Sequence, residues 1–272
     1  MKLLTLNSHS LIEDEYQKKL DMFVDAVIRE QPDIIALQEV NQSKNAGIVP
    51  VTELDGMTVI QRSVPVRADN HAANAAKLLG INGLHYNWVW LPIKTGYGKY
   101  DEGAALLSLF PIEDTDNFLS SASDDYDNWK TRRILGIKTK DEWFYSVHMG
   151  WWKDEDEPFS EQWKRINAHL SDIGPVWLMG DFNCRADMKN EGYDLICASG
   201  WHDTYTMALQ KDSGVTVEKA IDGWKEWESE KMRIDYIWKN SEAAIKRSKV
   251  VFNGKYYGAV SDHYGVMVDT EQ

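Results

Sequence analysis

The sequence predicts an α/β fold in a single domain comprising residues 1–272, and three observations support this prediction. Short apolar runs of strand length alternate along the chain with segments whose apolar residues recur at helical spacing. One strand–helix–strand unit near the N-terminus has a length that favours a parallel, right-handed connection. The 272 residues are 43% hydrophobic, enough for one large core, and no repeat or linker rich in Pro, Gly or Ser divides them.

The first unit begins with a buried strand at residues 3–6, which stops at Asn7. An amphipathic helix is expected at residues 15–30, because its apolar positions are three and four residues apart. The Gln-Pro pair that follows ends the helix, since proline disfavours helical geometry in its predecessor. A second buried strand at residues 34–37 then leads to Glu39.

The next part of the chain is less regular. Residues 41–70 show little periodicity and contain several Pro and Gly, so a long surface loop is expected there. The Ala-rich segment 70–79 should be a helix, and residues 86–93 and 104–109 should be strands. The glycine-rich segment 96–103 lacks the strand–glycine–helix order of a phosphate-binding loop, so no such loop is predicted.

Periodicity also predicts most elements of the second half. Strands are expected at residues 132–137, 143–148, 233–238, 250–252 and 264–268, strand character near 201–207, and helices at 158–170 and 193–198. Within residues 143–148, alternation places Phe144, Ser146 and His148 on one face of the strand.

The most informative strand begins at Val176 and runs through four apolar residues to Gly180. Asp181 and Asn183 follow, with one residue between them. Residues two apart in an extended chain point to the same side, so a carboxylate and a carboxamide would project together from the end of a buried strand.

The same arrangement, an apolar strand next to a carboxylate, amide or imidazole side chain, recurs along the chain. These residues are Asn7, Glu39, His148, Asp181, Asn183 and the pair Asp262 and His263, with Asp235 flanked by apolar residues inside its strand. Each has an ordinary explanation as a turn, cap or core residue, although a carboxylate within an apolar strand needs a partner. Together, oxygen ligands that suit Mg²⁺ or Mn²⁺ and an Asp–His couple describe metal-assisted attack of water on a phosphate ester.

Seven of these segments resemble motifs of the endonuclease/exonuclease/phosphatase superfamily, the DNase I-like group. They are Leu4–Asn7, Leu37–Val40, Glu102–Ser108, Ser146–His148, Gly180–Asn183, Arg233–Ile237 and Ser261–Gly265. Their order along the chain is that of the superfamily, which also holds AP endonucleases, inositol polyphosphate 5-phosphatases and neutral sphingomyelinases. The set is more similar to a bacterial branch of the superfamily than to its DNA-cleaving nucleases.

The resemblance implies a fold and a set of roles. The fold would be a four-layer α/β/β/α sandwich, with two mixed β-sheets packed face to face, helices outside, and the site at one rim. Glu39 would be the principal metal ligand, Asn7 a second ligand or a phosphate contact, and Asp262 a residue that supports a metal site. The catalytic residues would be Asp181 acting on the attacking water, Asn183 positioning it or the phosphate, His263 oriented by Asp235, and His148 contacting the phosphate.

Four further residues are expected to bind substrate. Arg132 or Arg133 matches an arginine that the family often carries at the start of that strand, and the sequence does not choose between them. His148 is followed by an aromatic and acidic stretch that includes Trp151 and Trp152. The two tryptophans either stack against a sugar, a base or a cationic head group, or pack under the following helix.

The expected function is hydrolysis of a phosphate ester, mono- or diester, with Mg²⁺ or Mn²⁺ as cofactor. The substrate would be a small molecule, a nucleotide or a lipid head group, because a net charge of −13 and the lack of a basic patch argue against extended nucleic acid. A DNase- or AP-endonuclease-like nuclease and a non-catalytic binding protein on the same fold are the alternatives. Two cysteines, Cys184 and Cys197, expected to be packed thiols, suit a reducing compartment, and with no apolar run long enough for a membrane span a cytoplasmic protein is predicted.

Overall fold

The computed structural model describes residues 1–60, 64–219, 221, 224 and 231–271. The helices are α1 (Tyr16–Glu30), α2 (His71–Ile81), α3 (Phe159–Leu170), α4 (Gly192–Ala198) and α5 (Thr204–Met207), with 3₁₀ turns at Ser10–Ile12 and Val51–Glu53. The strands are β1 (Lys2–Asn7), β2 (Ile34–Ser43), β3 (Asn87–Gly96), β4 (Tyr100–Ser108), β5 (Asp114–Leu119), β6 (Arg133–Thr139), β7 (Glu142–His148), β8 (Val176–Asp181), β9 (His202–Asp203), β10 (Gln210–Lys211), β11 (Asp235–Lys239), β12 (Ile245–Val251) and β13 (Gly265–Thr270).

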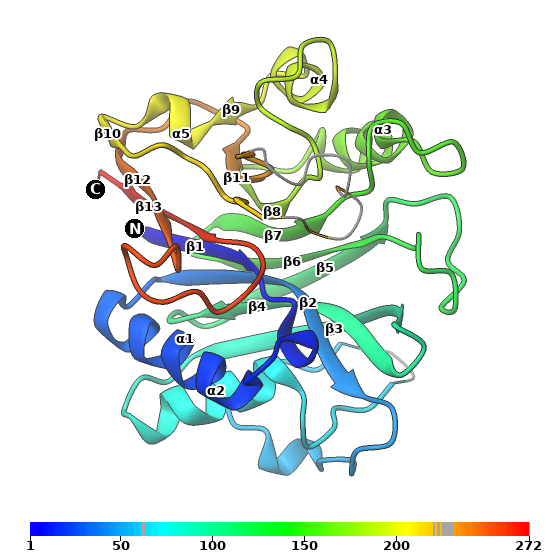
Figure 1. Ribbon diagram of the computed structural model, residues 1–272, viewed down its shortest axis with the longest axis vertical. Coiled ribbons are helices and arrows are strands. Elements are labelled where there is room, and N and C mark those ends of the chain that lie inside the picture. The colour runs from blue at the N-terminus through cyan, green and yellow to red at the C-terminus, as the bar shows by residue number, and fades with distance from the viewer. Residues whose placement is uncertain (61–63, 220, 222–223, 225–230, 272) are drawn as a thin grey trace.

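The described strands form two mixed sheets that pack face to face. One sheet has the order β10-β12-β13-β1-β2-β4-β3 and the other the order β5-β6-β7-β8-β11-β9. Figure 1 shows α1 and α2 on the outer side of the first sheet, and α3 and α4 on the outer side of the second. The predicted four-layer α/β/β/α sandwich is therefore confirmed.

Three apolar clusters lie between these four layers. Leu20, Phe23 and Val27 of α1 pack with the first sheet, while Phe159, Trp163 and Ile166 of α3 pack with the second. A third cluster joins the inner faces of both sheets. In β7, Phe144 belongs to this inner cluster and Tyr145 to the outer one, as the predicted alternation requires.

The predicted strand–helix–strand unit at the N-terminus is present. β1 pairs with β2 in parallel, and Asn7 lies opposite Gln38. α1 connects the two strands and ends where Gln31 adopts the left-handed conformation before Pro32. The unit therefore brings the ends of β1 and β2 to one rim of the sandwich.

Three sequence-based predictions are wrong in part. The expected loop 41–70 begins too early, because β2 continues to Ser43 through polar residues that are fully buried; residues 61–63 of this segment lie outside the described residues. Residues 201–207 form only a two-residue strand and then α5, since the Asp203 side chain caps that turn by accepting from the Tyr205 backbone N–H. Of the two cysteines expected to be packed, Cys184 is buried and Cys197 is exposed.

The glycine-rich segment 96–103 contains the turn between β3 and β4 and the first residues of β4. It is followed by a strand and not by a helix, in agreement with the prediction that it is no phosphate-binding loop. None of the helices in the described part of the chain is long and apolar enough to span a membrane.

Candidate active site

Three neighbouring strands of the second sheet have a polar side chain at the same rim, where β7 and β8 end and β11 begins. His148 of β7 lies opposite Asp181 of β8 in a parallel pair, and Asp181 lies opposite Asp235 of β11 in an antiparallel pair. Asn7 and Glu39 reach this rim from the first sheet, on β1 and β2. The two sheets thus bring together five residues that the sequence predicted as a site.

A glycine is required just before Asp181. Gly180 has a φ of 154°, and a Cβ at this position would lie 1.9 Å from the Val147 carbonyl oxygen. Only glycine allows β7 and β8 to approach this closely. The close approach holds His148 and Asp181 next to each other at the strand ends.

Glu39 lies in a β-bulge. The pairing of β2 with β4 shifts register between Leu37 and Val40, and Glu39 has a φ of 50°. Leu37 and Val40 both face α1 and α2, although their spacing would place them on opposite faces of a regular strand. The bulge therefore breaks the alternation of β2 at Glu39, whose side chain reaches the rim.

The side-chain amide of Asn7 connects two carboxylates. Its Nδ2 donates to Glu39 Oε1 at 2.9 Å and to Asp181 Oδ2 at 3.1 Å, and its Oδ1 accepts from the His9 backbone N–H at 3.3 Å. Asp181 Oδ1 also accepts from the Asn183 backbone N–H at 2.9 Å. In this orientation, the Asn7 side chain holds the carboxylates of Glu39 and Asp181 within hydrogen-bond distance of the same nitrogen, Nδ2.

Burial acts on both carboxylates. It raises the pKa of Asp181 to about 7, with Asp235 adding to the effect and His263 opposing it. Burial, together with the nearby Glu102 and Asp262, also raises the pKa of Glu39 above its usual range. Because their surroundings disfavour the charged form of both carboxylates, a cation placed between them would stabilise that form.

His263 and Asp235 form a buried dyad. His263 Nδ1 lies 3.0 Å from Asp235 Oδ2, and Nε2 lies 3.9 Å from Asp181 Oδ2. Burial alone would lower the pKa of His263, but the carboxylates of Asp235 and Asp181 outweigh it and raise this pKa well above its usual value. The dyad therefore presents a protonated imidazole beside Asp181.

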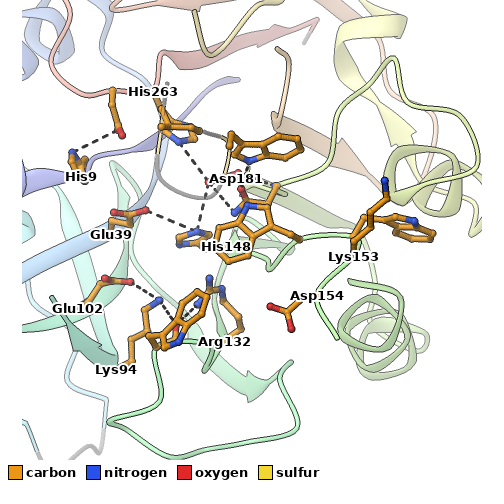
Figure 2. A pocket seen from close by; sticks show the side chains of 18 of the residues that line it. His9, Glu39, Lys94, Glu102, Arg132, His148, Lys153, Asp154, Asp181 and His263 are labelled. Atoms are coloured by element: carbon orange, nitrogen blue, oxygen red, sulfur yellow. Dashed lines mark hydrogen bonds and ion pairs between the residues drawn. The ribbon is translucent and has the colours of Figure 1, made fainter. Parts of the chain in front are cut away.

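The pKa of His148 is shifted in the opposite direction from that of His263. Its Nε2 lies 3.6 Å from Asp181 Oδ2 and 4.0 Å from Glu39 Oε1, and Figure 2 shows it in the middle of the site. Burial lowers the pKa of His148, and the positive charges of Arg132, Lys94 and His263 lower it further. His148 is therefore a neutral imidazole at the centre of a charged site.

Asp262 belongs to a second cluster that sequence reasoning found only in part. His9 Nδ1 lies 2.7 Å from Glu13 Oε1 and 3.7 Å from Asp262 Oδ1. Burial lowers the pKa of His9, but Glu13, Asp262 and Glu39 raise it to about 9. Asp262 thus lies with His9 at the edge of the site, and Glu13 also pairs with Lys19.

A cavity of about 840 Å³, a size suited to a small ligand, is lined by seven of these residues: His9, Glu39, His148, Asp181, Asn183, Asp262 and His263. Arg132 lines the cavity and is 4% exposed, whereas the guanidinium of Arg133 pairs with Asp124 away from it. The structure thus separates the two arginines that the sequence left equivalent. Lys94, Glu102 and Trp129 also line the cavity and were not predicted as site residues.

The two tryptophans after His148 have different surroundings, although both line the cavity. Trp152 packs on Phe159 of α3, with ring centroids 5.9 Å apart, as the packing alternative expected. Trp151 instead lies 5.9 Å from the Trp129 ring and 6.0 Å from the Arg132 guanidinium carbon. One of the pair therefore supports α3, and the other forms part of the cavity wall.

The donor set fits a hard divalent cation. The carboxylates of Glu39 and Asp181 supply oxygen ligands on either side of Asn7. Asp181, Asp235 and His263 have potential ligand atoms within 4.8 Å of one another, although His263 must lose its proton to bind a metal. His9, Glu13 and Asp262 form a second such group. Thiolate ligands, which would favour zinc, do not line the cavity among the described residues.

The residues that sequence reasoning missed carried a weak signal. Lys94 follows the apolar run of β3, and a charged residue at a buried strand position calls for a partner in the same way as Asp235. Glu102 gave a weaker signal, because it follows Asp101 at the start of β4. Trp224, whose Nε1 donates to Asn183 Oδ1 at 3.0 Å, follows no motif and could not be found in this way.

Comparisons with known proteins agree with this architecture. A model of the Endonuclease/Exonuclease/phosphatase family matches residues 4–263. A solved endonuclease/exonuclease/phosphatase family protein from Leptotrichia buccalis C-1013-b is 33% identical, with a TM-score of 0.85 and 100% of both chains covered. None of the curated proteins compared with the chain matches it.

More distant structures share the fold. A mannosyl-6-phosphatase from Bacteroides thetaiotaomicron VPI-5482 has a TM-score of 0.69 at 18% identity, and 100% of both chains is covered. The 3′ phosphatase NExo from Neisseria, bound to a product DNA hairpin, has a TM-score of 0.66 at 18% identity, also with 100% of both chains covered. The family match and the relative from Leptotrichia, rather than these two, show that the chain belongs to the endonuclease/exonuclease/phosphatase family.

Proposed function

We propose that this protein is a divalent-metal-dependent phosphoesterase that hydrolyses a small phosphate ester, such as a sugar phosphate, a nucleotide or a lipid head group. The observation that supports this most is the joining of two carboxylates by one amide: Asn7 Nδ2 contacts both Glu39 and Asp181. This pair lies beside the buried Asp235–His263 dyad on the wall of the same cavity.

Glu39 would be the principal ligand of Mg²⁺ or Mn²⁺, with Asn7 and Asp262 as supporting residues and Asp181 beside the ion. The ion would act as a Lewis acid that stabilises the negative charge of the reacting phosphoryl group. Hard oxygen donors in a carboxylate-rich setting favour these ions over softer metals.

The chain's own residues would activate the water molecule and stabilise the developing negative charge. Asp181 accepts a proton from a water molecule as the water oxygen bonds to phosphorus and the ester P–O bond breaks; the leaving oxygen is protonated by solvent. His263, kept protonated by Asp235, donates a hydrogen bond to the phosphoryl oxygens where negative charge accumulates. Asn183 positions the water or the phosphate, and neutral His148 contacts the phosphate.

A small substrate is favoured over extended nucleic acid. The chain carries a net charge of −13, which opposes a long polyanion, and the catalytic groups lie in a cavity bordered by Trp129, Trp151 and Trp152. A nuclease of the DNase or AP-endonuclease type is the alternative within the family.

The test is a metal-dependent activity screen. Protein stripped with EDTA would be assayed with and without added Mg²⁺ or Mn²⁺ on sugar phosphates, nucleoside monophosphates, lipid head-group esters, small diesters, and plain and abasic duplex DNA. We expect turnover of a small ester that requires the metal and falls by ~10²–10⁴-fold in a parallel preparation of Asp181→Ala. Turnover of DNA alone would favour the nuclease, and turnover without metal would contradict the proposal.

A non-catalytic protein would give a different result. If no ester were hydrolysed and calorimetry detected no Mg²⁺ binding at millimolar concentration, the binding-protein alternative would replace the enzyme.

A further inference from the structure

The cavity has a cationic end that the proposed chemistry does not explain. Lys94 comes from β3, and Arg132 immediately precedes β6. In Figure 2 these two side chains lie on the opposite side of His148 from His263, with Glu102 beside Lys94. We refer to Lys94, Glu102 and Arg132 as the cationic cluster.

The cluster is held together by one backbone carbonyl. The Trp129 carbonyl oxygen accepts from Lys94 Nζ at 2.7 Å and from Arg132 Nη1 at 3.0 Å. Arg132 Nη1 also donates to the Thr131 carbonyl at 3.2 Å. The two cationic groups are therefore fixed next to each other and cannot swing apart without losing these bonds.

Of the two buried cations, only Lys94 has a carboxylate partner among the described residues. Lys94 Nζ lies 3.2 Å from Glu102 Oε1. Arg132, by contrast, forms no ion pair within 4.0 Å with any carboxylate of the described residues, and its Nε has no hydrogen-bond partner among them. Lys94 is 7% exposed and Arg132 4% exposed, so water compensates little of the excess charge.

Metal binding would increase this imbalance. Burial lowers the pKa of the Arg132 guanidinium, and the carboxylates of Glu102, Glu39, Asp181 and Asp154 oppose this effect. A cation bound beside Glu39 and Asp181 would cancel their support, whereas Glu102 is already paired with Lys94 and Asp154 with Lys130. A net positive charge would then remain at this end of the cavity.

Aromatic rings border the cluster and reduce its access to water. Trp151 lies over the Arg132 guanidinium with 6.0 Å between the guanidinium carbon and the ring centroid, and Trp129 lies against Trp151. A buried cation next to apolar rings interacts more strongly with an anion than one in water does.

From this geometry we propose that Lys94 and Arg132 form an anion subsite that binds a second negative charge of the substrate. The subsite would make the protein select doubly charged phosphate compounds over singly charged diesters. This inference rests on the proposed function and specifies its substrate class. The second charge has two possible sources: the terminal phosphoryl group of a monoester, or a separate anionic group on the leaving part.

The first experiment measures binding rather than turnover. Calorimetry on Mg²⁺-loaded protein would compare inorganic phosphate at pH 8, mostly a dianion, with dimethyl phosphate, a monoanion. We expect Arg132→Met to weaken phosphate binding by about 10-fold or more and dimethyl phosphate binding much less, because a charge-assisted hydrogen bond is lost. Arg132→Lys should restore part of the affinity.

Arg133→Met is the matched control. Arg133 is adjacent in sequence, but its guanidinium pairs with Asp124 outside the cavity, so phosphate binding should change by less than about 2-fold. Equal phosphate affinity in Arg132→Met and the unmodified protein would overturn the subsite, as would an equal loss for both ligands. If thermal unfolding shows that Arg132→Met is not folded, Lys94→Met takes its place with the same expected pattern.

The second experiment identifies the source of the charge. Initial rates would be compared for a monoester, its methyl diester, and a methyl diester with a second phosphate on the leaving group. A monoester preference that Arg132→Met removes assigns the charge to the reacting phosphoryl group; recovery of rate with the third compound assigns it to the leaving group.

The two proposals can fail separately. Absence of turnover for every ester with metal would contradict the proposed function, while the phosphate calorimetry would still decide the subsite. Turnover with equal kcat/KM for monoester and diester, unchanged in ratio by Arg132→Met, would contradict the subsite alone.

Discussion

The two ends of the cavity differ in how their buried charges are partnered. At the acidic end, Asp181 accepts hydrogen bonds from Asn7 and Asn183, and Asp235 is paired with His263. At the cationic end, the Arg132 guanidinium donates only to backbone carbonyls among the described residues, and Lys94 alone pairs with Glu102.

If the proposed function holds, this difference divides recognition between two ligands. At the acidic end, the carboxylates of Glu39 and Asp181 both accept a hydrogen bond from Asn7, and a metal ion would supply a compact positive charge next to them. The cationic end lacks a negative charge, which a substrate would supply. At neither end do the described residues fully compensate the buried charge, so each end can be tested by itself.

The largest effect is expected at the acidic end. Asp181→Ala and His263→Ala should each lower kcat by ~10²–10⁴-fold, because each removes proton-transfer or oxyanion assistance. The measurement is steady-state kinetics on the ester found in the activity screen. Circular dichroism and thermal unfolding must show that both variants remain folded.

Unchanged turnover in both variants would exclude the assignment of this end as the reaction centre. An effect confined to KM would instead make the two residues binding groups.

A smaller effect is expected when one ligand charge is removed. Glu39→Gln should weaken Mn²⁺ or Mg²⁺ binding by about 10- to 100-fold, since the site loses a carboxylate charge while its shape is kept. Calorimetry with each metal measures this. Glu161→Gln on the exposed face of α3 is the control, and equal affinities in the two variants would place the metal elsewhere.

The acidic end could be predicted from the sequence because its residues follow a simple pattern. Asn7, His148 and Asp181 each end an apolar run of strand length, and strand ends meet at one rim. The position of Glu39 at this rim is explained by a bulge, which no periodicity indicates.

The cationic end could not be predicted in this way. Lys94 and Arg132 become neighbours only through the carbonyl of Trp129, a contact that depends on the tertiary fold. The sequence could not show which of Arg132 and Arg133 faces the cavity. Neighbouring residues of a strand point to opposite faces, so moving the start of the strand by one residue exchanges the two arginines.

Two features of the fold were missed for related reasons. β5 is a half-exposed edge strand of mostly polar residues, so it lacks the apolar alternation that reveals a strand. The end of β2 is buried but polar, because Gln42 donates to the Pro65 carbonyl and to Asp101 rather than packing against apolar side chains.

The smallest effects should separate the two adjacent tryptophans. Trp151→Leu removes the ring over Arg132 and should raise KM by roughly 2- to 5-fold with little change in Tm, as expected for the loss of a partly exposed cation–π contact. Trp152→Leu removes the ring packed on Phe159 and should lower Tm by about 2–4 °C.

Kinetics and thermal unfolding of both variants form one comparison. If Trp151→Leu lowered Tm as much as Trp152→Leu and left KM unchanged, the Trp151 ring would serve packing, and the cationic end would lose one of its walls. If KM rose only for the doubly charged substrate, Trp151 would act by keeping water away from Arg132, because excluding water strengthens the attraction between a buried cation and an anion.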